Sequence, residues 1–408
     1  MNEYKRKIIR KKYLTGKNIS LNKPFSEINV VDFSQGVAGP YCAMLLAQNG
    51  ANVIKVEPKE GDWSRILGDQ YGEHSAFSVA SNVGKKSIII DLKNEESKFI
   101  VDKIIANAHI FIEGFRPGVI ERLGYGYDTL KKKNKELIYL SISGFGQTGP
   151  MSKKPAMDPI IQAFTGFMSE NKGPDNYPHR TPIILFDMMT ALYATNAIVS
   201  NLYQHKNNKV GKKIEISLME SAAAMQSIRL MGEYMDGKYE PASAPAGTFK
   251  TKDGWIQIIA VKNQEFIRFC EAIGWDNLIN DNRFKSNSKR RENRDYLNKK
   301  IKKLFKSKST KFWQELLTKA RVQNEKVNTY TEFVNHEQTK ALDLISFIKQ
   351  PGDDAFWPMP KIPGMQKFSL NSKLSRSPKI GEHTRQIMQE LGFNKNEILY
   401  YLKNKVIG

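Results

Sequence analysis

The sequence has few cysteines and few histidines. Only two cysteines occur among 408 residues, Cys42 and Cys270, and each stands within an apolar segment of helical composition. This pattern is typical of reduced packing thiols and not of a disulfide framework. The six histidines are scattered, and none stands at metal-pair spacing with another His or Cys. The sequence therefore predicts no zinc site and no other metal site.

Long apolar runs are missing as well. No stretch approaches the roughly 18 consecutive apolar residues that a membrane span needs. Residues 1–12 are basic, but no apolar segment of the kind found in secretory signals follows them. We therefore expect a cytoplasmic protein that does not enter a membrane, preceded by a basic N-terminal extension over residues 1–24.

Acidic residues are outnumbered, which leaves a formal net charge of +21. Such an excess suggests a polyanionic partner, and a nucleic-acid-binding protein is one alternative, with a steep salt dependence of DNA binding as its signature. The lysines, however, are spread along the chain among acids and asparagines, without an RNA-binding or zinc-finger signature. We expect no nucleic acid, because a dispersed excess is more often a solvated surface.

The length and the 40% hydrophobic content fit two domains, or one large domain with an inserted lobe. Residues 28–57 are typical of a strand, a glycine loop with Gly36 and Gly39, a helix and a second strand. Backbone N–H groups of such a loop can approach a phosphate closely. The spacing from Gly36 to Glu57 also imitates a dinucleotide-binding fingerprint. A nicotinamide-dependent dehydrogenase therefore remains an alternative, which tight binding of NADH would favour.

Strands and helices continue to alternate, with further strands expected at 86–91, 109–113, 137–142 and 212–217. This order predicts an α/β protein with a doubly wound parallel sheet and a ligand crevice at the carboxyl ends of its strands. A long helix is expected from 218 to about 235. A hairpin over 248–259, a lysine-rich helical stretch to 333 and a return of the chain from 334 to 408 follow.

A single carboxylate, Asp187, interrupts the apolar run 181–199 at the expected entry to a helix. One reading is an N-cap, in which the carboxylate accepts hydrogen bonds from the first turn. The other is a nucleophile that attacks an activated acyl group and forms a covalent intermediate. From the residues around Asp187 alone the cap is the favoured interpretation, because aspartate is common at helix N-caps.

Seven motifs in order resemble the family III CoA-transferases, a group that includes formyl-CoA:oxalate and crotonobetainyl-CoA:carnitine CoA-transferases and α-methylacyl-CoA racemase. They begin at residue 25 or later and are Val31-Asp-Phe with Ala38-Gly-Pro40, 50–57, Gly61-Asp with Arg65, Phe115-Arg-Pro-Gly118, 143–150, Gln162-Ala-Phe-Thr-Gly166 and Gly381-Glu-His-Thr384. The resemblance implies a Rossmann-like large domain built from both chain ends (first part 25–235, return 334–408), a smaller inserted α+β domain (236–333) and an interlocked homodimer. It also implies a catalytic Asp, which the alignment places at Asp187, with Asp158 as a cap or pocket residue.

Departures from the family pattern narrow the function. The racemases carry a His just before the position of Asp158, where this chain has Met157, which cannot exchange a proton. An α-methylacyl-CoA racemase is therefore a weaker alternative. Val37 and the segment Ala244-Pro-Ala-Gly247 differ from the Gln and the four glycines of formyl-CoA transferase, which argues against an oxalate/formate enzyme. Among these types, the sequence motifs are most similar to those of the carnitine CoA-transferases, which share the Gln-Ala-Phe-x-Gly element.

We therefore predict a transferase that moves CoA from a small acyl-CoA to a free carboxylic acid through an acyl-aspartyl anhydride and an aspartyl-CoA thioester. No bound cofactor is expected, since CoA is the substrate. The residues expected to contact CoA are Gln35, Gly36, Val37, Ala38, Lys55, Lys59, Arg65, Phe115, Arg116 and Arg122. Those expected in the substrate pocket are Phe145, Gly146, Met157, Asp158, Ala246 and Gly247, the last two as donors to an oxyanion.

Overall fold

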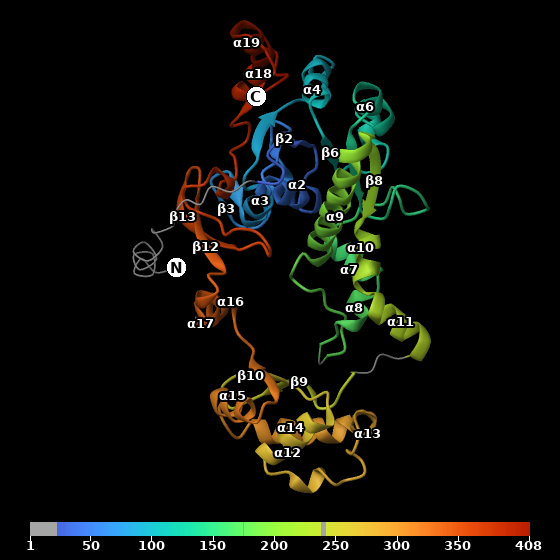
Figure 1. The fold of residues 1–408 in the computed structure, drawn as a ribbon, viewed down its shortest axis with the longest axis vertical. Helices are drawn as coiled ribbons and strands as arrows, with labels where there is room; N and C mark the ends of the chain where they lie inside the picture. Colours follow the sequence, from blue (N-terminus) through green and yellow to red (C-terminus); the bar gives the residue numbers. More distant parts are fainter. Residues whose placement is uncertain (1–22, 174, 238–241) are drawn as a thin grey trace. The chain divides into compact units, whose positions relative to one another are not determined.

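The computed structural model describes residues 23–173, 175–237 and 242–408 (Figure 1). The expected basic extension over 1–24 lies, apart from its last two residues, outside this range. The described chain forms two compact units. The larger unit contains the described residues up to Ser227 together with Asp343–Gly408, and the smaller unit is Ile228–Leu342. The sequence had suggested an insert over 236–333.

A six-stranded parallel sheet forms the centre of the larger unit, which confirms the predicted α/β class (Figure 1). In spatial order its strands are β5 (Lys86–Ile89), β2 (Asn52–Glu57), β1 (Asn29–Asp32), β6 (Ile110–Glu113), β7 (Ile138–Ser143) and β8 (Lys212–Ser217). All neighbouring strands pair in parallel, and Val31 of β1 lies opposite Ile54 on one side and Phe111 on the other. The carboxyl ends of these strands therefore share one edge of the sheet.

Successive residues of the central strands enter two different cores, because side chains alternate across a sheet. Val30 and Ile110 belong to one core, and Val31 and Phe111 to the other. Both faces of the sheet are thus covered by helices, which explains why β6 and β7 are buried along their whole length.

The core that contains Val30 is closed by α2 (Ala38–Gln48), α7 (Asp158–Phe164), α9 (Leu185–Asn208) and α10 (Leu218–Met225). The opposite core is closed by α4 (Ser97–Ala106), α5 (Val119–Arg122), α6 (Tyr127–Lys133), α18 (Thr384–Glu390) and α19 (Lys395–Lys403). The other elements of this unit are η1 (Trp63–Ile66), α3 (Ala76–Asn82), α8 (Phe167–Glu170), η3 (Lys373–Ser375) and the hairpins β3 (Gln70–Tyr71) with β4 (His74–Ser75) and β12 (Ile345–Gln350) with β13 (Asp353–Pro360).

Segments far apart in the sequence meet at the β5 edge of the sheet. The backbone N–H of Ser87 donates to Nδ1 of His383, at 3.2 Å, and the N–H of Ile89 donates to the hydroxyl of Thr384. Ile90 forms an antiparallel bridge with Ile407. Residues 381–407 therefore complete the unit that residues 29–217 begin.

The expected helix from 218 to about 235 is interrupted. Gln226 ends α10, and a separate helix, α11 (Ser227–Asp236), follows it. The Nε2 group of Gln226 donates to the hydroxyl of Thr165 at 3.2 Å, so this side chain joins the end of α10 to the segment after α7.

The smaller unit has its own core around a three-stranded antiparallel sheet. Its strands are β9 (Ala246–Lys250), β10 (Trp255–Ile259) and β11 (Gln323–Lys326), and the pairing of β9 with β10 confirms the predicted hairpin. Its helices are η2 (Asp276–Leu278), α12 (Asn263–Ala272), α13 (Asn287–Glu292), α14 (Arg294–Phe305), α15 (Thr310–Lys319), α16 (Tyr330–Asn335) and α17 (Glu337–Ala341). Arg290 is fully buried there, where its guanidinium donates to backbone carbonyls and lies over the ring of Phe266.

Candidate active site

Asp187 is the third residue of α9, in the helix's first turn. The backbone N–H groups of Phe186 and Asp187 both donate to Oδ2 of Asp158, at 2.5 and 3.3 Å. Asp158 is 2% exposed and begins the neighbouring helix α7. The cap of α9 is therefore supplied by a carboxylate from another helix, and Asp187 is not the cap in this structure.

The carboxylate of Asp187 is left without a donor. Within residues 23–173, 175–237 and 242–408, no hydrogen-bond donor or cation is paired with it. Burial, together with the nearby charge of Asp158, raises the pKa of Asp187 to about 7. A carboxylate in this state keeps its lone pairs free and is poorly stabilised as an anion, and both properties favour nucleophilic attack.

Gln162 fixes the chain that leads into α9. Its side chain is completely buried, and its amide oxygen accepts from the backbone N–H of Thr181 at 2.9 Å. Its Nε2 group donates to Oδ1 of Asp158 at 2.5 Å. One glutamine thus joins the cap of α9 to the segment just before it. The sequence had offered Gln162 only as part of a motif.

The loop after β7 packs against α7, the helix that Asp158 begins. Phe145 is 4% exposed, and its ring meets the ring of Phe164 on α7 edge to face, with centroids 5.1 Å apart. A Cβ on Gly144 would lie 2.4 Å from that of Ala156, so only glycine permits this approach. Gly146 has φ +97° and donates from its N–H to the hydroxyl of Ser143. Phe145 and Gly146 are therefore near the residues that precede Asp158, of which Met157 is exposed.

A buried carboxylate, Glu113, stands at the carboxyl end of β6. One of its oxygens accepts from the backbone N–H of Phe115 at 2.9 Å, and the other accepts from the hydroxyl of Ser141 on β7. The Oγ of Ser141 in turn accepts from Nε2 of Gln147 at 2.8 Å. Burial raises the pKa of Glu113 to about 7. We did not predict this cluster, although a single acid at the end of an apolar strand was its signal.

The glycine loop between β1 and α2 packs against Trp63 and is supported by Asp62. Gly36 has φ +84°, and a Cβ there would lie 2.3 Å from the ring of Trp63. The Gly36 N–H donates to Oδ1 of Asp62 at 2.9 Å. Val37 is the N-cap of α2 and makes no side-chain cap hydrogen bond, and Ala38 opens the helix. Gln35 is partly exposed at the loop's tip.

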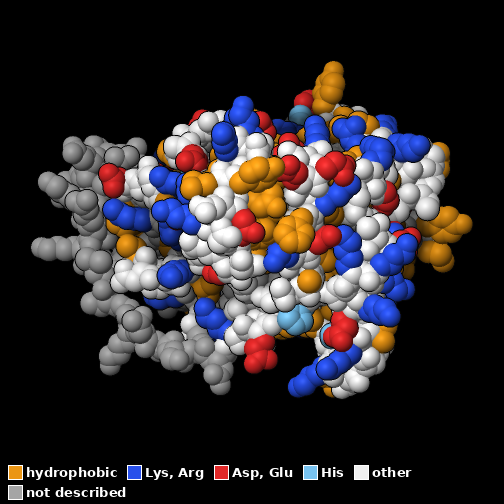
Figure 2. All heavy atoms as spheres, turned by 90° about the horizontal axis from the view of Figure 1, so that it is seen from above, with side chains coloured by type: hydrophobic (Ala, Val, Ile, Leu, Met, Phe, Trp, Pro, Cys, Tyr) orange, Lys and Arg blue, Asp and Glu red, His pale blue; other side chains and the backbone are white. Residues whose placement is uncertain are grey.

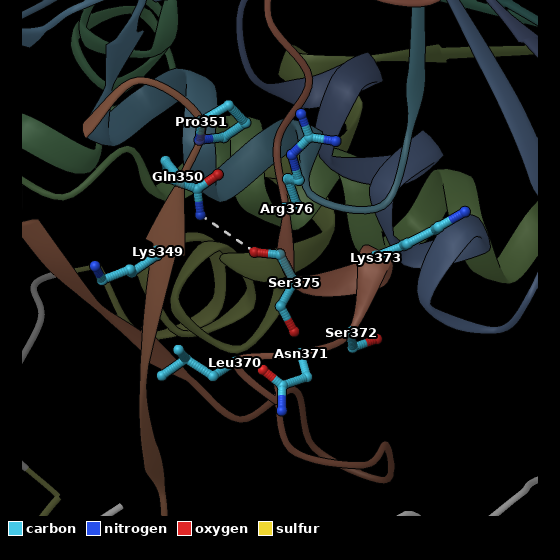
Figure 3. Close-up of a pocket in the computed structure, with 9 residues that line it drawn as sticks. All are labelled: Lys349, Gln350, Pro351, Leu370, Asn371, Ser372, Lys373, Ser375 and Arg376. Carbon is cyan, nitrogen blue, oxygen red and sulfur yellow. Dashed lines mark hydrogen bonds between the residues drawn. The ribbon is translucent and has the colours of Figure 1, made fainter. Parts of the chain in front are cut away.

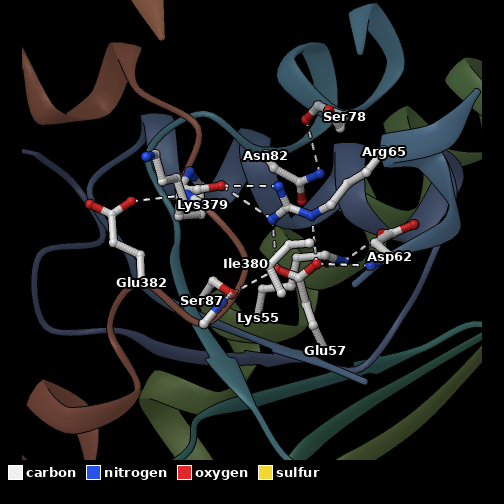
Figure 4. A network of polar contacts seen from close by, with 12 residues as sticks. Lys55, Glu57, Asp62, Arg65, Ser78, Asn82, Ser87, Lys379, Ile380 and Glu382 are labelled. Carbon is white, nitrogen blue, oxygen red and sulfur yellow. Dashed lines mark hydrogen bonds and ion pairs between the residues drawn. The ribbon is translucent and has the colours of Figure 1, made fainter. Parts of the chain in front are cut away.

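The cations expected beside this loop are buried in ion pairs (Figure 4). Nζ of Lys55 lies 2.7 Å from Oδ2 of Asp62 and donates to the carbonyl of Ser34 at 2.8 Å. Arg65 forms two hydrogen bonds to Glu57, at 2.7 and 2.8 Å. The expected phosphate contacts of Lys55 and Arg65 do not fit this arrangement, because carboxylates already occupy both charged groups. These two cations hold the loops in place instead.

The other expected cations are open to solvent. Lys59, Arg116 and Arg122 are exposed, and no carboxylate lies within ion-pair distance of them in the part of the chain that the structure describes. Phe115, which precedes Arg116 in the chain, is half-buried. Figure 2 shows that on one face of the molecule Lys and Arg mix with acidic and hydrophobic side chains and form no continuous positive patch.

A pocket of about 300 Å³ lies elsewhere, between β12 and the segment 370–376 (Figure 3). Its neutral lining includes Gln350, whose Nε2 donates to the carbonyl of Ser375 at 3.2 Å. Arg376 is paired with Glu382, and Lys349 and Lys373 extend away from the hollow (Figure 3). We assign this pocket no ligand.

Ala246 and Gly247 belong to β9 of the smaller unit, where Gly247 pairs with Ile258. Their expected role as oxyanion donors stays a prediction. Among the described residues, no group of three or more His, Cys, Asp or Glu side chains could hold a metal ion. No helix of the described chain is long and apolar enough to cross a membrane.

Comparison with known proteins gives a consistent result. The family model described as CoA-transferase family III matches residues 25–384. The succinyl-CoA:glutarate CoA-transferase of Mus musculus is 30% identical over 383 residues, which cover 90% of this chain and 86% of that protein. The acetyl-CoA:oxalate CoA-transferase of Acetobacter aceti is 33% identical over 331 residues, which cover 79% of this chain and 85% of that protein. The crystal structure of a CAIB/BAIF family protein from Brucella suis superposes with a TM-score of 0.79 at 30% identity, covering 91% of this chain and all of that one.

Proposed function

Because the chain belongs to CoA-transferase family III, a family of transferase enzymes, we propose that it moves CoA from a small acyl-CoA donor to a free carboxylic acid. We further propose Asp187 as its nucleophile. The observation that carries this assignment lies at the start of α9, where Asp158 makes the cap and the carboxylate of Asp187 has no partner among the described residues. A carboxylate that is neither a cap nor an ion-pair partner needs another reason to be there.

The proposed reaction consists of four acyl-transfer steps, and the last one regenerates the free Asp187 carboxylate. The Asp187 carboxylate attacks the thioester carbon, a C–O bond forms, the C–S bond breaks, and CoA leaves as a thiolate. The thiolate attacks the aspartyl carbonyl of the resulting anhydride and releases the donor acid as a carboxylate. The acceptor carboxylate then attacks the aspartyl thioester and again releases the thiolate. Finally, the thiolate attacks the acceptor's acyl carbon, which gives the new acyl-CoA and restores Asp187.

The surroundings of Asp187 suit these steps. Phe186 is fully buried and Met188 is partly buried, and we propose that these apolar neighbours in the sequence help to keep water from the anhydride. The first turn of α9 places partial positive charge beside the aspartyl group as it changes its bonding. No metal or redox group is required by this chemistry.

Three exposed cations, Lys59, Arg116 and Arg122, are available to the phosphates of CoA. We propose that these residues bind them. Both curated relatives described above are named for a dicarboxylic acid, glutarate or oxalate. Small dicarboxylic acids are therefore the first acceptors to test.

Trapping tests the nucleophile. Incubation with acyl-CoA and then hydroxylamine should modify the peptide that contains Asp187. Asp187→Asn should lower transfer by many orders of magnitude and keep CoA binding, because an amide cannot form the anhydride. Asp158→Asn is the matched control, since asparagine retains an acceptor for the cap and should leave the label on Asp187. Label on Asp158, or full activity of Asp187→Asn, would contradict the assignment.

A further inference from the structure

The hydrogen bonds that run from Glu113 through Ser141 to Gln147 have a fixed direction. An ionised carboxylate only accepts, so Ser141 must use its single proton on Glu113. The Ser141 oxygen then accepts from the amide NH₂ of Gln147, at 2.8 Å. The amide oxygen of Gln147 is thereby turned away from Ser141, and no donor among the described residues occupies it.

Protonation of Glu113 would reverse the direction of these hydrogen bonds, because the backbone of Phe115 fixes which oxygen of Glu113 takes the proton. Its N–H occupies Oε2 of Glu113, so a proton taken up by Glu113 resides on Oε1, which faces Ser141. Glu113 would then donate to Ser141, and the serine proton would need another acceptor. Rotation of the Gln147 amide supplies one, because its oxygen would replace its NH₂ group against Ser141. Without that rotation the buried hydroxyl would leave its proton unpaired, which is unfavourable away from water.

Gln147 lies where its orientation matters. It is partly exposed on the loop that follows β7, at the sheet edge where ligands of parallel sheets bind. The same loop packs through Phe145 against α7, and α7 supplies the cap of α9 beside Asp187. Helix α7 therefore links this loop to the start of α9, where the proposed nucleophile lies.

Building on the proposed transferase function, we propose that Glu113 is a positioning residue that holds the amide oxygen of Gln147 toward the bound substrate. The group that this oxygen recognises is a hydrogen-bond donor. An amide N–H of the pantetheine arm of acyl-CoA and a hydroxyl of the acceptor acid share this chemistry. The Michaelis constants for the two substrates, measured separately, distinguish the sources.

The charges that face Glu113 come from three neighbouring elements. Glu121 of α5 raises the pKa of Glu113, and Lys213 of β8 lowers it. Tyr139 of β7 also lies close, because the charge of Glu113 raises the pKa of the Tyr139 hydroxyl. Burial is the largest cause of the raised pKa of Glu113. The orientation of Gln147 should therefore change near neutral pH.

Glu113→Gln imitates the protonated state. The Phe115 N–H requires the new amide oxygen, so the new NH₂ group must face Ser141 and donate to it. We expect this variant at pH 8 to show the KM of the wild type at pH 6, which is about threefold to tenfold above the wild-type value at pH 8, as for one lost neutral hydrogen bond. At pH 8 Asp187 is mostly ionised in both proteins, so its ionisation cancels when the variant and the wild type are compared at that pH.

Three further variants complete the test. Gln147→Met should show the raised KM at both pH values, so it should differ from the wild type at pH 8 and match it at pH 6. Ser141→Ala should remove the pH dependence of that KM. Glu121→Gln removes an equal charge outside the hydrogen-bond chain and should keep the wild-type KM at pH 8.

If Glu113→Gln does not fold, Gln147→Met on the partly exposed loop decides alone. A wild-type pH dependence of KM in Glu113→Gln or Gln147→Met would overturn the proposal. A wild type inactive with every acyl-CoA would overturn the proposed function instead.

Discussion

At the scale of single residues, the ionisation of Asp187 sets the pH range of catalysis. Its pKa is raised to about 7, and only the ionised form can attack a thioester. Transfer should therefore increase as pH rises through 7 and level off above it. Asp158→Asn removes the neighbouring negative charge and should move this increase to lower pH. A profile of log kcat against pH measures the shift, and Asp128→Asn, on the exposed surface of α6, should leave the profile unchanged.

The same raised pKa makes Asp187 unfavourable for stability at alkaline pH. The folded state prefers the protonated carboxyl, so the free energy of unfolding should fall as pH rises from about 4 through 7. Asp187→Asn removes this dependence and should stabilise the protein at pH 8 by about 1–3 kcal/mol, with little effect at pH 4. Urea titrations at both pH values would show this, and equal effects of the substitution at both would count against it.

The three exposed cations give a prediction for CoA affinity. Replacing Lys59, Arg116 and Arg122 together by alanine should raise the KM for acyl-CoA by at least tenfold, since each phosphate contact is a charge-assisted hydrogen bond. Replacing the exposed residues Lys93, Lys395 and Lys403 changes the net charge equally and serves as the control. Equal KM values for the two triple variants would exclude the proposed contacts.

At the scale of elements, the buried pairs beside the glycine loop should contribute more than surface pairs. Arg65→Met leaves Glu57 charged and buried without its partner, which should destabilise the protein by about 3–5 kcal/mol. Lys86→Met breaks the partly exposed pair with Glu390 and should cost at most about 1 kcal/mol. Denaturation midpoints compare the two, and similar losses would mean that the pair of Arg65 and Glu57 is no more than a surface contact.

The sequence predicted the elements of the larger unit because their signals are local. Apolar strands that end in turns mark β1, β2, β6 and β7, and the hairpin of the smaller unit carries a Lys-Asp-Gly turn. It also placed Asp187 at a helix entry, since the run around it has only one carboxylate.

The hydrogen bonds that connect the site residues depend on which helices and strands are neighbours, and no local sequence pattern encodes this. Asp158 reaches α9 across 28 residues, and Glu113 reaches Ser141 across the same separation because β6 pairs with β7. The sequence also presents Lys55 and Arg65 as free cations. Their burial appears only when the loop around Asp62 closes over them.

At the scale of the whole molecule, exposed apolar side chains support the predicted homodimer. On α9, Leu192, Tyr193 and Tyr203 are open to solvent, the last with 78% of its surface exposed. On α11, Ile228 is 84% and Tyr234 is 91% exposed. Faces of this kind on a single chain mark interfaces more often than solvated surface.

Light scattering should therefore give a mass near twice the 46.5 kDa of the chain. Tyr203→Lys places a charge in the α9 face and should weaken the dimer, whereas Tyr330→Lys, on the exposed surface of α16, should not. A stable and active species at the mass of one chain would rule the dimer out.

The β5 edge of the central sheet has a consequence for how the protein is made. Ser87 and Ile89 obtain partners from His383 and Thr384, and Ile90 from Ile407. At about 5–20 residues per second, a ribosome completes β5 many seconds before these partners emerge. During that interval the nascent chain carries an unpaired strand edge, which is a template for aggregation. Chaperone binding to nascent chains should therefore begin after β5 is made and end only when residues 383–407 have left the ribosome.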